Sequence, residues 1–590
     1  MIDKVKNEIF SINGPVIKVK NTSDFSMMEM VYVGFKKIIG EVISINEVET
    51  TIQVYESTDG LKPKEPVIGA KTPLFATLGP GIISNIYDGI QRPLKDMEIE
   101  NGKFIKIGSS VKALNSEKLF DTQIHVKIGD SIAPGQIYAS CQESPLILHK
   151  CMLAPNLPSG MITHIAKDGM HKINDLIIVY KTNFGEEIKL NLCQKWPIRL
   201  ARPIKNRLKI SKPLITGQRI IDTLFPIAKG GTSAIPGGFG TGKTMTQHAL
   251  AKWSDADVIV YIGCGERGNE ITQVLEEFLK LVDPKTGNKL TDRTILIANT
   301  SNMPVAAREA SIYTGITLAE YYRDMGYDVA IMADSTSRWA EALREISGRL
   351  EEMPAEEGFP SYLPSRLAQF YERAGLVETL SNKQGSITII GAVSPQGADF
   401  SEPVTQNTKR FVRCFWALDK NLAYSRHYPA INWLNSYSDY CNDLTNFFNN
   451  EISENFLENR SQILKILNKE SKLMEIVKLI GADVLPDDEK LILAIAKTIR
   501  VGFLQQNTFD RIDAFVALEK QNKMMELILF FYEKCKKLIE KGTPFSVLTN
   551  SLIFNKIERV KFEIANNEIE KFQIYFDEIN SFVEKQILNL

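Results

Sequence analysis

The chain has 590 residues, and its 70 Lys and Arg against 71 Asp and Glu give a formal net charge of −1. Apolar residues make up 44% and charged residues 24%, the usage of globular proteins, which excludes a disordered, collagen-like or purely coiled-coil chain. The length suits about three to five domains. Because a basic excess is missing, we expect no nucleic-acid partner.

Nothing in the sequence predicts direct insertion into a membrane. No stretch approaches the ~20 apolar residues of a spanning helix, and Met1–Lys6 lacks the apolar core of a signal peptide. The seven cysteines are dispersed without a CxxC pair, and the six histidines form no HExxH or HxH arrangement. We therefore expect a cytoplasmic protein with reduced thiols, which contacts a membrane only through partners.

Two stretches of the first third are rich in short β-strands. Between Ile9 and about Thr72, runs such as Val16–Val19, Glu41–Ile45 and Thr51–Val54 are separated by Gly, Asn and Asp. Close spacing of short strands predicts a small antiparallel barrel. From about 107 to 187, Gly-Asp, Pro-Gly and Asp-Gly turns break a second series of strands, which predicts a second β-rich module.

The sequence pattern changes between about Pro213 and Ala430, where apolar runs typical of β-strands alternate with helical stretches. The strand candidates are Val258–Ile262, Thr294–Ala298, Val329–Ala333 and Ile387–Val393. This alternation predicts a parallel sheet covered by helices on both faces.

After about Ser438 the composition is mostly helical, and Leu485–Asp488 supplies a helix start. One apolar stripe recurs at +3 and +4 spacing near the end: Ile569, Phe572, Phe576, Ile579, Val583 and Ile587. We favour packing of this stripe within the domain. A coil that binds a partner is the alternative.

A phosphate-binding motif lies in the central region. It fits GxxxxGK[ST] and consists of Gly237, Gly238, Phe239, Gly240, Thr241, Gly242, Lys243 and Thr244. The glycines let backbone N–H groups turn toward phosphate oxygens, while the lysine supplies charge and the terminal threonine a hydroxyl for Mg²⁺. A strand over Thr232–Ile235 and a helix over Met245–Lys252 would place this loop at a helix N-terminus, where an anion binds.

Two other predicted strands end in carboxylates. Asp334 closes an apolar strand and is suited to hold Mg²⁺, directly or through water. Glu266 follows Val258–Ile262 in a glycine-flanked loop and can orient the attacking water, while Arg267 can pair with a phosphate or steer Glu266. We interpret Cys264 as a packing residue, because no histidine is near it in sequence.

The base-binding side has no motif of its own. No NKxD motif for guanine is present, and no Asp-Glu helicase pair follows the Asp334 strand. Stacking on aromatic side chains from later in the chain is therefore expected.

These motifs occur together with others along nearly the whole chain. The additional segments are Leu78–Ile82, Tyr87–Leu94, Gly265–Glu270, Asn299–Ala310, Ala333–Ala340, Glu357–Pro360, Tyr371–Gly375, Phe400–Thr405 and Pro429–Trp433. Through these segments taken together, the chain resembles the catalytic A subunit of the rotary V-type and archaeal-type (V/A-type) ATPases. Coverage is weakest before about 65 and after about 440.

The resemblance implies a multidomain α/β protein with four parts. An N-terminal β-barrel would occupy 1–72, and a β-rich inserted domain 107–187. A RecA-like P-loop domain with a parallel sheet would combine 73–106 with 188–437, and a helical C-terminal domain would occupy 438–590. The inserted domain is absent from the F-type β subunit.

The resemblance also implies function. The chain would hydrolyse or synthesise ATP in the peripheral sector of a rotary ATPase, coupled to H⁺ or Na⁺ transport, with Mg²⁺ and ATP or ADP bound. By position, Lys243, Glu266 and Arg267 would be catalytic, and Thr244 and Asp334 would face the metal. Adenine would lie between Tyr428 and Phe509.

The implied partners are a non-catalytic B subunit, which alternates with this chain in an A3B3 hexamer and supplies an arginine finger, the central-stalk rotor and the peripheral stalk. The chain would be cytoplasmic and peripheral to the membrane.

Some positions depart from the family pattern without removing a catalytic group. Tyr428 stands where Phe is usual, Thr508 where Ala is usual, and Ala398 where a second Gly is common. Thr241 replaces the cysteine of eukaryotic relatives, so redox control through this position is not expected.

Two other functions would use part of the same pattern. An ATPase of a flagellar or type III export apparatus would share the P-loop core, but the long β-rich insertion argues against it. A non-enzymatic nucleotide-binding module is disfavoured because Glu266, Lys243, Thr244 and Asp334 are all present.

Overall fold

The computed structural model describes residues 7–20, 24–102, 105–109, 111–283 and 286–588. The N-terminal Met1–Lys6 lie outside this range. The chain forms two compact units. Unit one comprises the residues up to Lys209, Gly230–Thr232 and Ala256–Phe411, and unit two comprises Ile210–Lys229, Ser233–Asp255 and Val412–Leu590.

Unit one begins with the predicted antiparallel barrel. Its strands are β1 (Ile9–Asn13), β2 (Val16–Lys20), β3 (Glu29–Val33), β4 (Ile38–Ile45), β5 (Glu49–Val54) and β6 (Val67–Pro73), paired in the order β1-β2-β5-β4-β3-β6. Backbone bonds from Ile9 N to Glu65 O (2.9 Å) and from Val67 N to Asn7 O (2.9 Å) join the two end strands. Ile17, Val42 and other fully buried aliphatic side chains fill the interior. Among the strands that the structure describes here, these bonds close the sheet into a ring.

The second β-rich segment forms two four-stranded antiparallel sheets, in agreement with the predicted β-rich module. One has the order β12-β11-β9-β14 and the other β10-β13-β15-β16. The strands are β9 (Leu119–Ile124), β10 (Ser131–Ile132), β11 (Ile137–Gln142), β12 (Leu148–Met152), β13 (Gly160–Ile165), β14 (Gly169–Lys172), β15 (Ile178–Thr182) and β16 (Glu187–Leu190). A two-stranded ribbon, β7 (Phe75–Leu78) with β17 (Gln194–Pro197), lies at the base of this segment.

The main sheet of unit one is parallel. It has the order β24-β22-β20-β21-β8, with β8 (Ile86–Tyr87), β20 (Val258–Glu266), β21 (Thr294–Thr300), β22 (Asp328–Asp334) and β24 (Gln384–Val393). All four strands predicted in this region are confirmed. Their almost unbroken apolar runs follow from burial on both faces.

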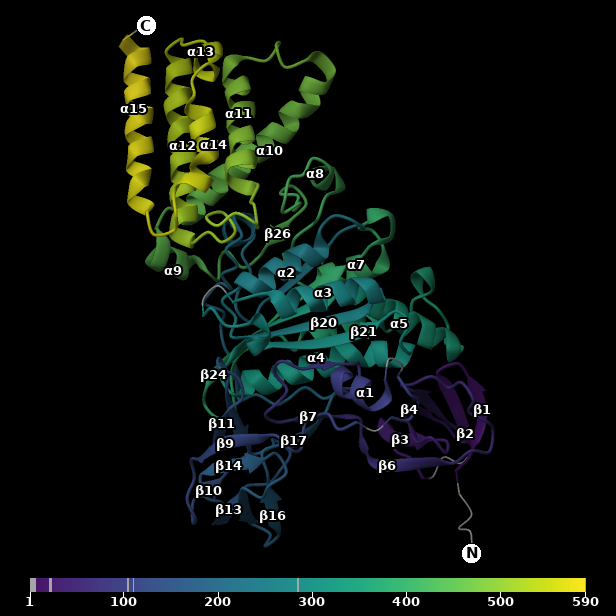
Figure 1. Cartoon of the computed structure of the whole chain (residues 1–590). Helices are drawn as coiled ribbons and strands as arrows, with labels where there is room; N and C mark the ends of the chain where they lie inside the picture. Colours follow the sequence, from purple (N-terminus) through teal and green to yellow (C-terminus); the bar gives the residue numbers. More distant parts are fainter. Residues whose placement is uncertain (1–6, 21–23, 103–104, 110, 284–285, 589–590) are drawn as a thin grey trace, which may run out of the picture. The chain divides into compact units, whose positions relative to one another are not determined.

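Helices cover the main sheet on both sides. Figure 1 shows α3 (Gly268–Lys280) above β20 and β21, and α4 (Val305–Asp324) below them. The other elements of unit one are α1 (Leu94–Asn101), α5 (Thr336–Arg349), α6 (Leu363–Tyr371), α7 (Pro403–Phe411), β18 (Asn206–Arg207) and β23 (Gly375–Glu378), of which β23 pairs antiparallel with β24.

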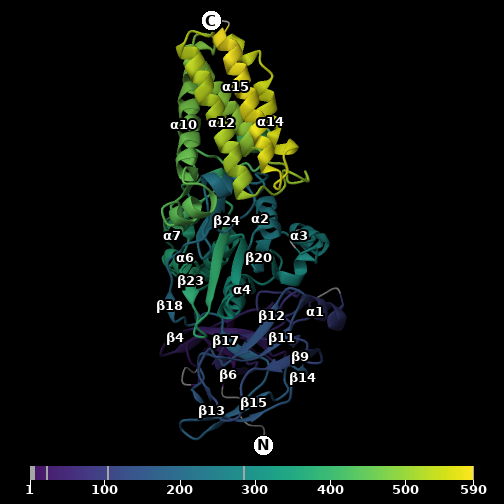
Figure 2. The ribbon, with the colours of Figure 1, turned by 90° about the vertical axis from the view of Figure 1, so that its left-hand side faces the viewer.

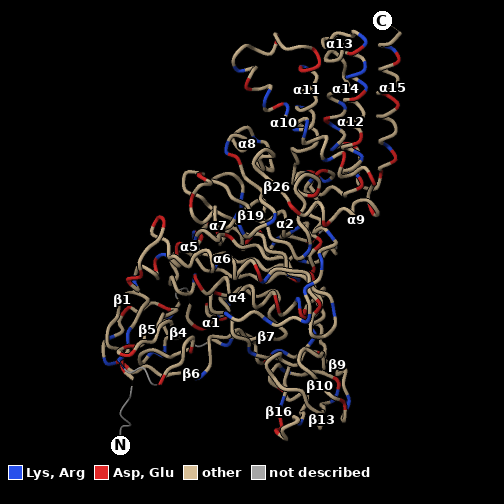
Figure 3. Tube along the Cα trace, turned by 180° about the vertical axis from the view of Figure 1, so that it is seen from behind, with Lys and Arg blue, Asp and Glu red and all other residues tan. Residues whose placement is uncertain are grey.

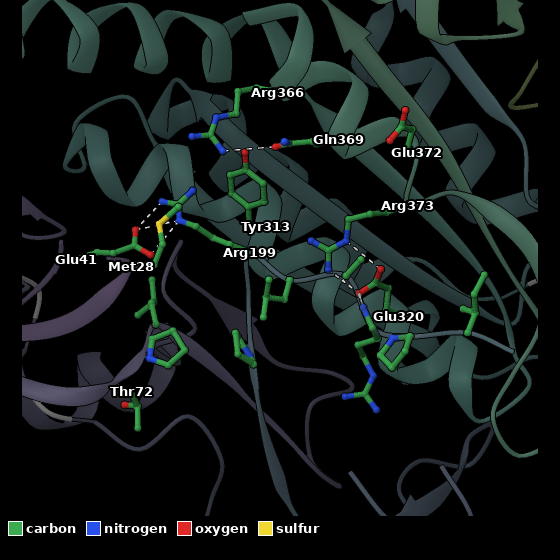
Figure 4. A pocket seen from close by; sticks show the side chains of 18 of the residues that line it. Met28, Glu41, Thr72, Arg199, Tyr313, Glu320, Arg366, Gln369, Glu372 and Arg373 are labelled. Atoms are coloured by element: carbon green, nitrogen blue, oxygen red, sulfur yellow. Dashed lines mark hydrogen bonds and ion pairs between the residues drawn. The ribbon is translucent and has the colours of Figure 1, made fainter. Parts of the chain in front are cut away.

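Unit one contains a cavity of about 900 Å³ between the barrel and α4. The cavity is lined by charged side chains, several of which pair with one another (Figure 4). Arg199 binds Glu41 of β4 at 2.7 Å and Glu309 of α4 at 2.8 Å, and Arg373 binds Glu320 at 2.6 Å. Arg199 therefore ties the barrel to α4.

Unit two contains the P-loop and the helical C-terminal part. Here β19 (Thr232–Pro236) runs parallel to β25 (Cys414–Phe415), which pairs with β26 (Tyr437–Ser438). The helices are α2 (Lys243–Trp253), α8 (Lys420–Tyr424), α9 (Thr445–Phe447), α10 (Phe456–Ile480), α11 (Asp487–Thr498), α12 (Leu518–Glu540), α13 (Phe545–Thr549), α14 (Ile553–Glu563) and α15 (Phe572–Leu588).

The long C-terminal helices run alongside one another as a bundle (Figure 2), and both signs of charge are distributed along them (Figure 3). α11 begins at Asp487, as the start signal predicts. Most of the apolar stripe on α15 packs inward: Phe572, Ile579 and Val583 are buried, and Phe576 contacts Phe530 of α12. Ile587 is exposed. In the part of the chain that the structure describes, no helix combines the length and the apolar run needed to cross a bilayer.

Candidate active site

The P-loop has the geometry of a phosphate cradle. It connects the buried strand β19 to α2, which begins at Lys243 with Gly242 as its N-cap. Gly240 (φ 76°) and Gly242 (φ 88°) lie in the left-handed region that favours glycine. A Cβ on Gly237 would lie 2.6 Å from Thr241 Oγ1, so a side chain there would displace the loop.

The side chains of the P-loop support this turn. Lys243 Nζ donates to Gly237 O at 2.7 Å and to Gly238 O at 3.2 Å, and Thr241 Oγ1 donates to Gly238 O at 2.8 Å. The ammonium group thus lies over the loop that would receive the phosphates. Phe239 is 84% exposed, in contrast to the buried Thr241.

The two aromatic candidates also belong to unit two. The Tyr428 ring lies next to the P-loop: a Cβ built on Gly242 would be 3.6 Å from Tyr428 Cε1. Tyr428 is 44% exposed and Phe509 is 88% exposed, so both rings are available for stacking. The backbone of Tyr428 accepts a bond from Gln506, in the loop that carries Phe509.

Unit one positions the two carboxylates. Glu266 is the last residue of β20 and Asp334 the last of β22, and these strands are parallel neighbours with Gly263 opposite Asp334. Tyr261 of β20 donates from its hydroxyl to Asp334 Oδ2 at 3.0 Å. Parallel alignment therefore places both acids at the same sheet edge.

Glu266 is set up to exchange a proton near neutral pH. Burial, and then the charge of Asp334, raise its pKa to about 7, and the charge of Arg338 opposes this rise. A carboxyl group with this pKa is suited to general-base work. Arg267, the next residue, is the exposed N-cap of α3.

Cys264 has the structural role predicted for it. Its side chain is fully buried, and burial raises the pKa of its thiol to about 12. The adjacent Gly265 (φ 73°) would bring a Cβ within 2.8 Å of both Arg308 and Arg338, so only glycine fits there.

Sequence reasoning missed three residues that support the predicted site residues: Tyr261 and Arg338 in unit one, and Gln506 in unit two. Tyr261 could have been found, since a polar aromatic in an otherwise apolar strand, one parallel strand away from Asp334, needs a partner. Gln506 gives no such signal, because most of its partners are distant in sequence. Arg338 gives none either, because its ion pair with Glu341 is local and does not reveal the effect of its charge on Glu266.

The donors available fit Mg²⁺ but not a closed protein metal site. The Thr244 hydroxyl and the Asp334 carboxylate are hard oxygen ligands, and Mg²⁺ is commonly held by one or two such groups with substrate phosphates. No group of three or more His, Cys, Asp or Glu residues gathers around a common point in the described ranges.

Comparison with known proteins agrees with these features. The family model of the ATP synthase alpha/beta family nucleotide-binding domain matches residues 217–438, and that of its beta-barrel domain matches 9–70. The barrel-sandwich domain of the ATP synthase alpha/beta subunit matches 111–199, and the C-terminal domain of V and A type ATP synthase matches 445–547.

Relatives cover the whole chain. It is 59% identical to V-type ATP synthase alpha chain 2 of Clostridium tetani over 100% of this chain and 99% of the relative. It is 55% identical to the V-type ATP synthase alpha chain of Halothermothrix orenii and 53% identical to the A subunit of the A-type ATP synthase of Methanopyrus kandleri, each over 98% of both chains.

Among solved structures, the ATPase EscN of the type III secretion system of enteropathogenic E. coli matches with a TM-score of 0.63 and 21% identity, covering 89% of this chain and 100% of that chain. This likeness shows the fold alone. The full-length relatives favour the ATP synthase interpretation over an export ATPase, and the chain belongs to the ATP synthase alpha/beta family, with the alpha or A subunits of the V-type and A-type ATP synthases.

Proposed function

We propose that this chain is the subunit of a V/A-type rotary ATPase in which ATP is hydrolysed or synthesised, with ion transport coupled through the complex. The observation that carries the proposal is the complete P-loop at a strand–helix junction. The same chain also has two neighbouring strands that end in Glu266 and Asp334. A merely structural nucleotide module would not need a carboxyl group whose pKa is raised to about 7.

The mechanism assigns a task to each residue. The P-loop N–H groups and Lys243 bind the β- and γ-phosphates, and Glu266 orients the water for in-line attack and accepts its proton. Arg267 supports the γ-phosphate. Tyr428 and Phe509 stack on adenine from opposite sides.

Thr244 and Asp334 would hold Mg²⁺. When bound, the metal neutralises charge on the phosphate oxygens. Both residues are oriented by the chain: Thr244 lies in the first turn of α2, and Asp334 accepts the Tyr261 hydrogen bond. A B subunit would supply an arginine finger in trans.

The proposed location follows from the assembly. The chain would lie on the cytoplasmic side, peripheral to the membrane, and contact rotor and stalk subunits rather than lipid.

Mg·ATP hydrolysis by the chain alone and after mixing with its cognate B subunit tests this proposal. We expect strong stimulation, because the partner completes the site. Full activity alone, unchanged by the partner, would indicate a self-assembling homo-oligomeric ATPase instead.

Glu266→Gln tests the assigned base in the same assay. It should leave ATP bound but reduce turnover by roughly 10²–10⁴-fold, while Glu276→Gln, at an exposed position farther along α3, serves as the matched control. Near-normal hydrolysis by Glu266→Gln in the assembled complex would refute the role.

A further inference from the structure

The loop Gln505–Phe509, here called the base-side loop, follows the helical turn Ile499–Leu504 and carries the exposed Phe509 ring. An exposed ring at a loop tip stacks on a base only if the loop backbone is fixed. Several of the contacts that hold this loop are made by one buried residue, Gln506, which is 3% exposed.

Gln506 connects three separate segments. Its backbone N–H donates to Tyr428 O at 2.8 Å. Its side-chain Nε2 donates to Gly217 O and to Asp513 O, both at 2.8 Å, and its Oε1 accepts from Arg219 N at 2.9 Å. The amide therefore uses both its donor hydrogens and its acceptor on backbone groups.

A second chain of bonds leads from Asp513 to Phe509. The Asp513 carboxylate is fully buried, pairs with the Arg219 guanidinium and accepts from Asn507 N at 2.7 Å. Asn507 Oδ1 in turn accepts from Phe509 N at 3.0 Å. Arg219 also donates to the carbonyls of Phe503 and Gln505, so it holds the start of the loop as well.

We propose that Gln506 is a positioning residue that fixes Tyr428 and the base-side loop relative to each other, and thereby sets the nucleobase site. The inference rests on the proposed stacking of adenine by these two rings. Gln506 acts through the hydrogen bonds that it makes to backbone groups of other segments, and it touches no substrate. Loss of its side chain would leave Asp513 O and Arg219 N unpaired and Gly217 O with only the bond from Val516 N, and so loosen the loop, while the backbone bond to Tyr428 O and the bonds of the P-loop would remain.

The experiment compares a ligand with a base and one without. Mg·ATP and inorganic tripolyphosphate are titrated by calorimetry into the full chain carrying Gln506→Ala. We expect the Kd for ATP to rise roughly tenfold, the size of one weakened base–aromatic stack, and the Kd for tripolyphosphate to stay within about twofold of wild type. In the assembled complex, KM for ATP should rise while kcat is unchanged.

Two further variants sharpen the comparison. Gln505→Ala is the matched control, since its Nε2 makes one bond to Arg426 O at 3.2 Å on the exposed side of the loop. Asn507→Ala removes only the exposed link to Phe509 N and provides a milder change should Gln506→Ala not fold. It should weaken ATP binding about threefold and leave tripolyphosphate binding intact.

The outcomes separate the inference from the function on which it rests. If Phe509→Ala weakens ATP binding but Gln506→Ala and Asn507→Ala do not, the positioning role is wrong and the stacking role stands. Equal weakening of ATP and tripolyphosphate by Gln506→Ala would indicate general damage and also overturn the inference. If Phe509→Ala itself leaves ATP binding unchanged, the proposed base site fails.

Discussion

Glu266 lies at the end of a strand next to the carboxylate of Asp334, and this environment sets the pH range in which Glu266 can accept a proton. Because burial and Asp334 raise its pKa to about 7, the carboxyl is protonated below that pH. A protonated carboxyl cannot accept the proton of the attacking water.

The single-turnover rate of ATP hydrolysis should therefore fall about tenfold per pH unit below pH 7. Rapid-quench measurements on the assembled complex between about pH 5.5 and pH 8 would show this limb. Glu266→Gln should be slow throughout, with no such limb. A wild-type rate that is flat over this range would contradict the assignment.

His427, the residue before Tyr428, should make stability depend on pH. It is 8% exposed, and burial with the charges of Arg500 and Lys561 lowers its pKa from 6.5 to about 4. Between about pH 4 and pH 6.5 the unfolded chain binds more protons than the folded chain. The contribution of His427 to the free energy of unfolding is therefore complete above pH 6.5 and falls by up to about 3 kcal/mol as the pH drops from 6.5 to about 4.

His427→Phe keeps a ring against Trp433 and removes the titration. Urea unfolding followed by tryptophan fluorescence at several pH values gives the comparison, and the difference between wild type and variant isolates His427 from other acid-titrating groups. Parallel curves for the two proteins would show that His427 does not contribute.

At the scale of single residues, the sequence identifies groups whose role follows from a local motif. Lys243, Thr244 and the glycines of the P-loop are recognisable because their chemistry is contiguous in the chain. Gln506 is not, because its partners Tyr428, Gly217 and Arg219 lie far from it in the sequence. The roles assigned to the site residues stay predictions until the variants are measured.

At the scale of elements, α15 shows how an apolar stripe becomes a packing face. Ile579 is 1% exposed on the side of α12, whereas Ile574 on the same helix is 58% exposed. Ile579→Ala should destabilise the protein by about 2–5 kcal/mol, because it removes buried methyl groups and leaves a cavity.

Ile574→Ala is the matched control and should change the free energy of unfolding by no more than about 0.5 kcal/mol. Denaturant unfolding of both variants tests the assignment. Equal effects at the two positions would mean that α15 buries a different face, for example against a partner.

The elements themselves were largely predictable, because periodicity and turn residues are local. The strands β20, β21, β22 and β24 and the start of α11 lie where the sequence places them. The pairing order is a different matter: no local pattern in the sequence puts β5 between β2 and β4, or β22 between β20 and β24. Such order depends on contacts between segments far apart in the chain. The predicted domain boundaries stay predictions.

At the scale of the whole molecule, the barrel and the nucleotide-binding part of unit one are joined by buried charge. Arg199 is 12% exposed and pairs with Glu41 and Glu309, which are nearly fully buried. Arg199→Met would leave both carboxylates buried without their cation and should cost about 3–5 kcal/mol.

Lys205→Met is the control, because its ion pair with Glu378 is largely exposed and contributes about 0–1 kcal/mol. Thermal unfolding of the two variants, with limited proteolysis to detect release of the barrel, distinguishes them. A small loss from Arg199→Met, matching that of Lys205→Met, would mean that apolar packing alone holds the barrel.

The barrel-sandwich enters and leaves its host at one spot. A Cβ on Gly79 would lie 2.8 Å from Cys193 Cβ and 3.2 Å from Leu114 Cδ1. Leu114, which precedes the barrel-sandwich strands, and Cys193, which follows them, therefore both lie beside Gly79 at the β7–β17 ribbon. A segment whose ends touch can be gained or lost by a chain without rethreading the rest, since a short turn would close the gap. The segment is also tied to α4, because the Tyr322 hydroxyl donates to Glu143 at 2.9 Å and the Tyr321 hydroxyl lies 3.0 Å from His149 Nε2, so a pull applied to its far end would be delivered to α4 as well as to the ribbon.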